Sequence, residues 1–140
     1  MIHIAIVEDE EKYRKQLREY IEQYCEKSGK QIQTSFFQDG EDIIENYTAD
    51  FDLIFMDRMT AAREIRKLDK KVILMFITSI ATYAIEGYEV DALDYILKPL
   101  SYNMFEQKLN RALLRGDGQE EHYFLIQTSE ETLRIKVTEI

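Results

Sequence analysis

The chain has a single cysteine, an excess of acidic over basic residues, and no long apolar run. Cys25 is alone, so no disulfide can form within the chain, which fits a reducing compartment. Lys and Arg number 18 against 27 Asp and Glu, a formal net charge of −9, which argues against nucleic-acid binding through bulk electrostatics. No apolar run approaches the ~20 residues of a membrane helix. Because the chain starts in a predicted strand, no signal peptide is expected either, and we expect a cytoplasmic protein.

The 140 residues suit one compact domain with a short appendage. Short, apolar, β-branched segments predict strands, and segments with apolar residues three to four apart predict helices. They alternate strictly along the chain. The predicted strands cover 2–7, 31–37, 52–56, 72–77 and 94–97, and the predicted helices cover 10–27, 42–47, 61–68, 80–88 and 101–114. This order predicts an α/β fold: a flavodoxin-like, doubly wound sheet of five parallel strands in the order 2-1-3-4-5, flanked by five helices.

The character of the sequence changes after Arg115. Residues 116–121 are polar and contain two glycines, which predicts a linker. Residues 122–140 alternate like two strands around a polar turn, which predicts a β-hairpin tail. Two strands alone are marginal in water, so we expect this tail to be the beginning of a second domain.

Polar residues follow four of the predicted strands. Glu8 and Asp9 follow the first, Asp57 the third and Thr78 the fourth, and Lys98 follows the fifth, directly before Pro99. In a parallel sheet these strand ends share one edge, where ligands of such folds bind. Clustered carboxylates repel one another unless a cation neutralises them, and Mg²⁺ prefers oxygen ligands. A carboxylate can also accept a phosphoryl group as an acyl phosphate, a reaction that needs positioning and charge neutralisation. We expect Lys98 to supply a positive charge that balances Asp57 and later a phosphoryl oxygen.

Each of these residues also has an ordinary structural explanation. Acidic residues stabilise a helix N-terminus, Asp57 alone could cap a helix, and Lys98 alone could be a solvated lysine. Their joint position at consecutive strand ends favours a functional site instead.

Residues 1–115 resemble a response regulator receiver domain. The matching motifs are Ile-Val-Glu-Asp-Glu at 6–10, Asp-Leu-Ile-Phe-Met-Asp at 52–57, Phe-Ile-Thr-Ser at 76–79 and Asp-Tyr-Ile-Leu-Lys-Pro at 94–99. The stretch 84–99 resembles the receivers attached to LytTR-type DNA-binding domains, and the tail is similar to the first strands of such a domain. The resemblance divides the chain into a receiver domain (1–115), a linker (116–121) and the beginning of an effector domain (122–140).

The resemblance implies a role for each site residue. Asp57 would be the phosphoacceptor, phosphorylated by a sensor histidine kinase, and Glu8, Asp9 and Asp57 would bind Mg²⁺. Thr78 and Lys98 would stabilise the phosphoryl group, and Pro99 is the candidate for a cis peptide bond. Thr78 and Tyr95 would act as the switch, Tyr95 by changing rotamer.

The switch would reshape a face formed by residues 80–114. Dimerisation through that face is expected, and the protein would control transcription through its attached effector domain. DNA binding is expected only through that domain, of which this chain carries the beginning.

One departure from the family pattern concerns the segment after Asp57. Receivers usually have several residues here, typically containing Met-Pro and Asp-Gly, before the next helix. In this chain Arg58, Met59 and Thr60 run directly into that helix. The family segment contains a backbone carbonyl that completes the metal site, so its loss bears on Mg²⁺ binding and on phosphorylation.

Two other functions stay open at this level. A phosphorylation-independent pseudo-receiver would account for the short segment after Asp57. A haloacid dehalogenase-type phosphatase also places a nucleophilic Asp after an apolar strand, but it needs a second Asp where this chain has Met59.

Overall fold

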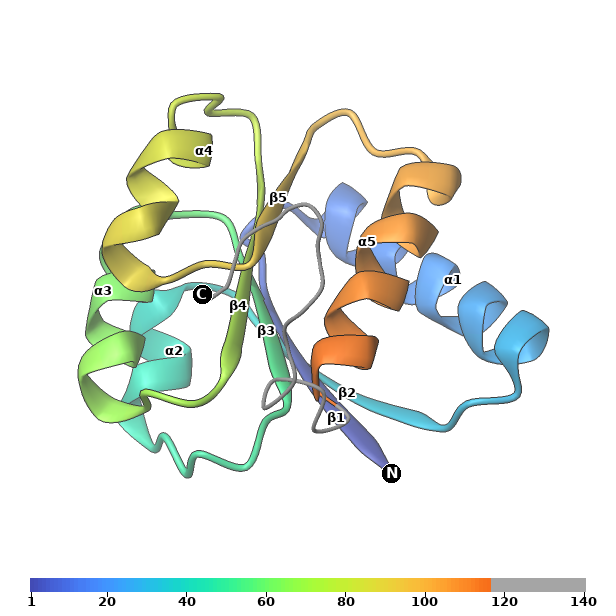
Figure 1. Ribbon diagram of the computed structural model, residues 1–140, viewed down its shortest axis with the longest axis horizontal. Coiled ribbons are helices and arrows are strands. Elements are labelled where there is room, and N and C mark those ends of the chain that lie inside the picture. The colour runs from blue at the N-terminus through green and yellow to red at the C-terminus, as the bar shows by residue number, and fades with distance from the viewer. Residues whose placement is uncertain (117–140) are drawn as a thin grey trace. The chain divides into compact units, whose positions relative to one another are not determined.

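The computed structural model describes residues 1–116, and its centre is a sheet of five parallel strands (Figure 1). The strand order is β2-β1-β3-β4-β5, so the predicted topology is confirmed. The strands are β1 (Ile2–Val7), β2 (Ile32–Phe37), β3 (Leu53–Met56), β4 (Ile73–Thr78) and β5 (Asp94–Leu97).

Helices connect the strands in strict alternation. They are α1 (Glu11–Ser28), α2 (Gly40–Glu45), α3 (Met59–Leu68), α4 (Tyr83–Glu86), the 3-10 helix η1 (Gly87–Val90) and α5 (Tyr102–Gly116). In Figure 1, α1 and the first turns of α5 lie on one face of the sheet, and α2, α3 and α4 lie on the other. Ser101 Oγ accepts a hydrogen bond from the backbone N–H of Met104 at 3.3 Å, as expected of an N-cap.

The chain divides into two compact units, Met1–Lys108 and Leu109–Ile140. The whole sheet lies in the first unit. Of the second, the structure describes residues 109–116, the last turns of α5. Helix α5 ends at Gly116, so the first residue of the predicted linker 116–121 is helical. The rest of that linker and the predicted hairpin at 122–140 lie outside the described residues.

Buried apolar side chains pack the central strands against α2 and α3. β3 has no polar side chain, and all four of its residues are buried, as expected for a strand covered on both faces. The cluster on the α2 and α3 side contains Ala5, Val7, Ile43, Ile54, Met56, Met59, Ala61, Ala62, Ile65, Val72, Leu74, Phe76 and Val90. On the other side, the ring of Phe105 from α5 packs against that of Phe55 from β3, with centroids 5.7 Å apart.

Helix α3 starts two residues earlier than predicted. The prediction placed its start at Ala61, but the helix begins at Met59, whose side chain is buried in the same cluster as Ala62 and Ile65. Burial of Met59 favours one more half-turn of helix. Only Asp57 and Arg58 therefore separate β3 from α3.

The predicted helix at 80–88 is only partly correct. One turn, α4, is α-helical, and it is flanked by bonds from residue i to i+3: the N–H of Tyr83 donates to the carbonyl of Ile80, and that of Asp91 to Tyr88. In this region Gly87 lies close to Ala92, and a Cβ on Gly87 would be 3.3 Å from that of Ala92. The chain then turns into β5 through Asp91, whose φ is 54°.

Candidate functional site

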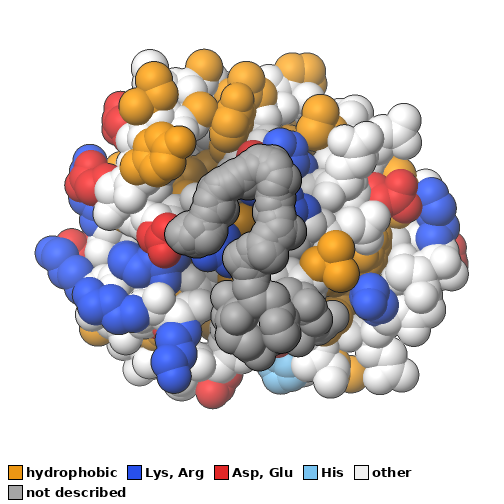
Figure 2. Space-filling model, viewed as in Figure 1, with side chains coloured by type: hydrophobic (Ala, Val, Ile, Leu, Met, Phe, Trp, Pro, Cys, Tyr) orange, Lys and Arg blue, Asp and Glu red, His pale blue; other side chains and the backbone are white. Residues whose placement is uncertain are grey.

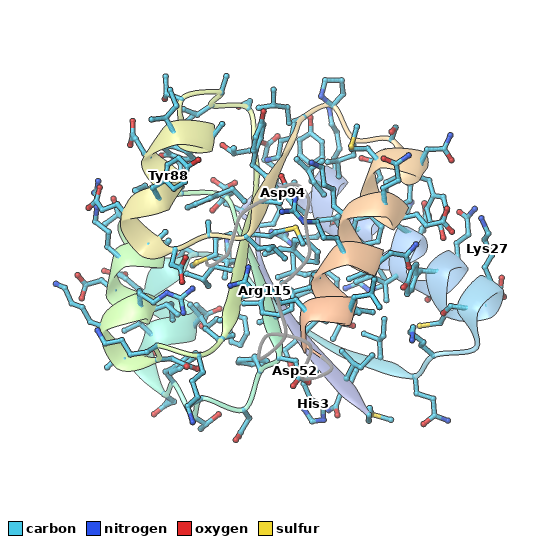
Figure 3. The ribbon with its side chains drawn as sticks, viewed as in Figure 1. His3, Lys27, Asp52, Tyr88, Asp94 and Arg115 are labelled. Atoms are coloured by element: carbon cyan, nitrogen blue, oxygen red, sulfur yellow. The ribbon has the colours of Figure 1, made fainter. Side chains whose placement is uncertain are left out.

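The predicted site residues lie at the carboxyl edge of the sheet. Glu8 and Asp9 follow β1, Asp57 follows β3, Thr78 ends β4 and Lys98 follows β5. These four strands are neighbours in the sheet and run in the same direction. The opposite edge is marked in Figure 3 by His3 and Asp52, where the backbone N–H of His3 donates to Asp52 Oδ2 at 2.8 Å.

Glu8 is the most deeply buried polar residue at this edge, with 1% of its surface exposed. Its Oε2 accepts hydrogen bonds at 3.1 Å from Lys98 Nζ and from the backbone N–H of Glu10. Its Oε1 lies 2.9 Å from the same ammonium but makes no hydrogen bond of good geometry. A buried carboxylate oxygen without a hydrogen bond is costly, so this atom has capacity for one more electropositive partner.

Lys98 pairs with Glu8, whereas the sequence predicted that it would balance Asp57. Its side chain is 8% exposed, and Nζ also lies 3.7 Å from Glu10 Oε2. A buried ammonium requires a close anionic partner, and the buried carboxylate within reach of Lys98 is that of Glu8. The charge of Lys98 still acts on Asp57, because it lowers the pKa of that carboxyl.

Asp57 is half-buried, and its side chain makes no hydrogen bond or ion pair with the residues that the structure describes. The pKa of Asp57 is raised from 3.8 to about 6, mainly by burial and also by the negative charges of Glu8 and Asp9, against smaller opposing effects of Arg58 and Lys98. A carboxylate left without a partner among other carboxylates is typical of a functional group.

Three carboxylates are grouped closely enough to share a metal ion. Oxygen atoms of Glu8, Asp9 and Glu10 all lie within 4.8 Å of one another. Glu10 thus joins the predicted Glu8 and Asp9 in this group, and the predicted role of Asp57 as a ligand stays a prediction. The unbonded Oε1 of Glu8 and an all-oxygen donor set fit Mg²⁺, which keeps several waters and needs few protein ligands.

Thr78 lies at the same edge with its hydroxyl buried. Its Oγ1 accepts a hydrogen bond from the backbone N–H of Ile80 at 3.1 Å, and its carbonyl accepts one from Lys98 N–H at 2.9 Å. Since the hydroxyl accepts in this bond, its own proton stays available to donate.

Tyr95 lies on β5, away from the carboxylates, and packs against the cluster under α4 and η1. It lines two hollows. One of about 140 Å³ is shared with Tyr83, Gly87 and Tyr88, and one of about 310 Å³ with Leu97, Pro99 and Met104. The peptide bond between Lys98 and Pro99 is cis.

Three further residues at this edge were not predicted from the sequence. Glu10 belongs to the acidic group, Arg58 Nη2 lies 3.6 Å from Asp9 Oδ2, and the ring of Tyr13 lies against Lys98. The acidic run at 8–11 was a signal for Glu10, and adjacency to Asp57 was one for Arg58. Tyr13 has the spacing of a core-facing helix residue, so nothing in the sequence indicated its contact with Lys98.

The fold and the edge residues define a class of signalling domain, and comparison with known proteins identifies it. Residues 4–110 match the response regulator receiver domain. The chain belongs to this family. Membership gives no support to the phosphatase alternative.

Among curated proteins, the chain is similar to transcriptional and sensory regulators. It is 30% identical over 120 residues to the sensory transduction protein LytT of Oceanobacillus iheyensis, covering 79% of this chain and 47% of that protein. It is 28% identical over 140 residues to the transcriptional regulatory protein BtsR of Escherichia coli, covering 96% of this chain and 56% of that protein. The chain thus spans about half the length of these relatives.

Solved structures share the fold. The response regulatory domain of protein mrkE from Klebsiella pneumoniae superposes with a TM-score of 0.71 at 27% identity, covering 84% of this chain and all of that one (100%). Response regulator TrrA from Thermotoga maritima, solved in complex with Mg²⁺ and BeF, gives a TM-score of 0.66 at 22% identity, covering 80% and 99% of the two chains. Within residues 1–116, no helix combines the length and apolarity that crossing a membrane requires.

Proposed function

We propose that this protein is a phosphoacceptor response regulator in which Asp57 takes a phosphoryl group from a sensor histidine kinase. The observation that carries the proposal is the half-buried Asp57 carboxylate, which has no hydrogen-bond partner among the described residues and faces two acidic neighbours and two cations. One carboxylate oxygen attacks phosphorus, and the bond from phosphorus to the donor atom breaks with its electron pair leaving on the donor. The product is an acyl phosphate on Asp57, which water later hydrolyses.

Glu8 and Asp9 would hold Mg²⁺ together with Asp57, and the structure adds Glu10 to the candidate ligands. When bound, the ion would supply positive charge that offsets the carboxylates and the phosphoryl oxygens. Thr78 would donate its hydroxyl proton to a phosphoryl oxygen. Lys98 would exchange one oxygen of Glu8 for another phosphoryl oxygen, since both are anionic acceptors at the same edge.

Tyr95 would change rotamer when Asp57 is phosphorylated. Tyr95 lines two hollows, and these would give its ring space for a second rotamer. Thr78 and Tyr95 lie on neighbouring strands, with Phe76 of β4 paired to Tyr95 and Thr78 paired to Leu97. A shift of Thr78 toward a phosphoryl group would therefore be felt at β5, which is the coupling that a two-state switch requires.

The switch would act on a surface over α4, η1, β5 and the start of α5. Large apolar side chains are exposed there, among them Ile85 at 73% and Tyr88 at 84%. Figure 2 shows hydrophobic side chains gathered over α4, and Figure 3 labels Tyr88. Exposed apolar residues of this size favour an interface, and a symmetric homodimer would use the same surface on both copies.

The output of the switch would be transcription. The relatives named above are a sensory transduction protein and a transcriptional regulatory protein, each about twice as long as the aligned part. We infer that a LytTR-type effector domain, of which residues 122–140 would be the beginning, makes the DNA contacts.

Intact mass spectrometry after incubation with acetyl phosphate tests the proposal. We expect an adduct of ~80 Da that requires Mg²⁺ and is absent from Asp57→Ala. Glu8→Gln should reduce the adduct, and Asp52→Asn, at the opposite edge, should not. An adduct that survives in Asp57→Ala, or none in a folded wild type, would overturn the proposal.

The short connection after Asp57 favours a second candidate, a pseudo-receiver that works without phosphorylation. Since α3 begins at Met59, no extended segment follows Asp57 to supply a further oxygen ligand. A full-length protein whose Asp57→Ala variant regulates its target normally would favour this alternative.

A further inference from the structure

Lys98 has a second contact besides its ion pair with Glu8. Its Nζ lies 4.2 Å from the centroid of the Tyr13 ring, a distance at which an ammonium is attracted by an aromatic face. With its side chain 8% exposed and a Glu8 oxygen at 2.9 Å, the ammonium lies between a carboxylate and an aromatic ring.

We propose that Tyr13 is a positioning residue for Lys98, holding the ammonium at the carboxyl edge of the sheet. This inference rests on the proposed function, because the role of Lys98 is to meet the phosphoryl group on Asp57. Among the described residues, Tyr13 makes no hydrogen bond with Asp57, so it would act through Lys98.

The segment that carries the acidic group also carries Tyr13. Glu8 and Glu10 precede α1, and the backbone N–H of Tyr13 donates to the carbonyl of Glu10 at 3.1 Å in the first turn. Lys98 arrives from the end of β5. The short segment 8–13 therefore supplies both the carboxylates that pair with Lys98 and the ring against which it lies.

The two contacts differ in what they permit. The hydrogen bond to Glu8 is directional, so it holds the ammonium at that carboxylate. Attraction to a ring face depends weakly on direction, so the ammonium can turn toward a new oxygen while it stays on the ring. With Tyr13 in place, Lys98 would exchange Glu8 for a phosphoryl oxygen without returning to water.

Lys12 provides a matched control. Its Nζ lies 5.0 Å from the centroid of the same ring, but the residue is exposed and makes no ion pair with the described carboxylates. If Tyr13 acted on Lys12 and not on Lys98, Lys12→Gln would have the same effect on phosphorylation as Tyr13→Leu.

The direct test is NMR of the lysine ε-methylene groups, with the Lys98 signal assigned by its disappearance in Lys98→Gln. Protons over a ring face shift upfield, so the Lys98 signal should be upfield in the wild type, in Tyr13→Phe and in Lys12→Gln. In Tyr13→Leu it should move to the position of an exposed lysine. An unshifted signal in the wild type, or an upfield signal that persists in Tyr13→Leu, would overturn the proposal.

The second test is the rate of phosphorylation by acetyl phosphate at saturating Mg²⁺. We expect Tyr13→Leu to lower the maximal rate by ~10-fold, and Tyr13→Phe to stay within about 2-fold, because the phenyl face keeps most of the attraction. The half-saturating Mg²⁺ concentration should not change. A full maximal rate in a folded Tyr13→Leu variant would overturn the role of Tyr13. If no variant is phosphorylated, the wild type included, the proposed function fails, while the NMR result still decides whether Tyr13 positions Lys98.

Discussion

Asp57 and Asp69 are half-buried aspartates at opposite ends of helix α3, and their environments differ in kind. Asp69 accepts hydrogen bonds from Tyr47 Oη at 2.7 Å and from the backbone N–H groups of Lys71 and Val72 at 3.0 and 3.1 Å. Asp57 accepts none from the described residues. Burial alone would raise both pKa values, but the bonds to Asp69 outweigh burial and lower its pKa, whereas the pKa of Asp57 rises to about 6.

The hydrogen bonds of Asp69 stabilise the fold, whereas Asp57 is the carboxylate that we propose for ligand binding. Asp69 completes the hydrogen bonding of the turn between α3 and β4. Asp57 is kept in a state that a cation or a phosphoryl group would relieve. On this proposal, the carboxylate that serves stability and the one that serves function lie at different ends of one helix.

The largest expected effect is the loss of the structural carboxylate. Asp69→Ala removes the acceptor for three donors, so we expect the free energy of unfolding to fall by ~3 kcal/mol, measured by urea denaturation at pH 7. Asp69→Asn retains one acceptor oxygen and should lose less. A loss below ~0.5 kcal/mol in Asp69→Ala would show that the two aspartates do not differ in this way.

Asp57→Asn should raise the free energy of unfolding, whereas Asp69→Ala should lower it. Because the native pKa of about 6 lies above the ordinary 3.8, the folded protein binds more protons than the unfolded chain between these pH values, and stability falls as pH rises through this range. Removing the charge should therefore stabilise the metal-free protein by about 2 kcal/mol at pH 7, with the gain vanishing below pH ~4. Urea denaturation in EDTA from pH 4 to 8 measures it. Asp50→Asn, an exposed acid before β3, is the control, and a gain independent of pH would contradict the assignment.

Mg²⁺ should raise the free energy of unfolding by binding the carboxylates near Asp57 and not by binding Asp69. At ten times the dissociation constant, binding to the native state raises the free energy of unfolding by about 1.4 kcal/mol. We expect this gain in the wild type and in Asp69→Asn, and a smaller gain in Glu8→Gln, followed by thermal denaturation with and without Mg²⁺. Equal gains in the wild type and Glu8→Gln would place the ion elsewhere.

The smallest expected effect is that of Arg58→Gln. The pair of Arg58 with Asp9 is exposed, at 65% and 45% of the two side chains, so stability should change by no more than ~0.5 kcal/mol. Because Arg58 lowers the pKa of Asp57, its loss should raise that pKa further, as seen by carbon NMR of the labelled carboxyl. Arg63 lies further along α3 and pairs with Glu89 of η1. Arg63→Gln breaks that pair and should leave the pKa of Asp57 unchanged.

The sheet and the edge residues could be predicted from the sequence because they depend on local patterns. Apolar runs such as 72–77 mark buried strands, and a parallel topology brings their ends to one edge. Glu8, Asp57, Thr78 and Lys98 were placed at that edge by counting residues, without any knowledge of side-chain contacts.

The partners of these residues depend on packing, which a pattern does not contain. Lys98 was expected beside Asp57, but the buried carboxylate within its reach belongs to Glu8. The start of α3 at Met59 reflects the burial of that side chain in the core, and the close packing of Gly87 on Ala92 after α4 is likewise a tertiary contact that local periodicity does not record.

The two-residue connection between β3 and α3 has a consequence for the thermodynamics of ligand binding. A long loop would have to become ordered around an ion or a phosphoryl group, at a cost in conformational entropy. Here the backbone on both sides of Asp57 is already fixed by a strand and a helix. The ordering that remains is that of exposed side chains such as Glu10 and Arg58, so calorimetry of Mg²⁺ binding should show a small entropic penalty from the polypeptide and little change in heat capacity.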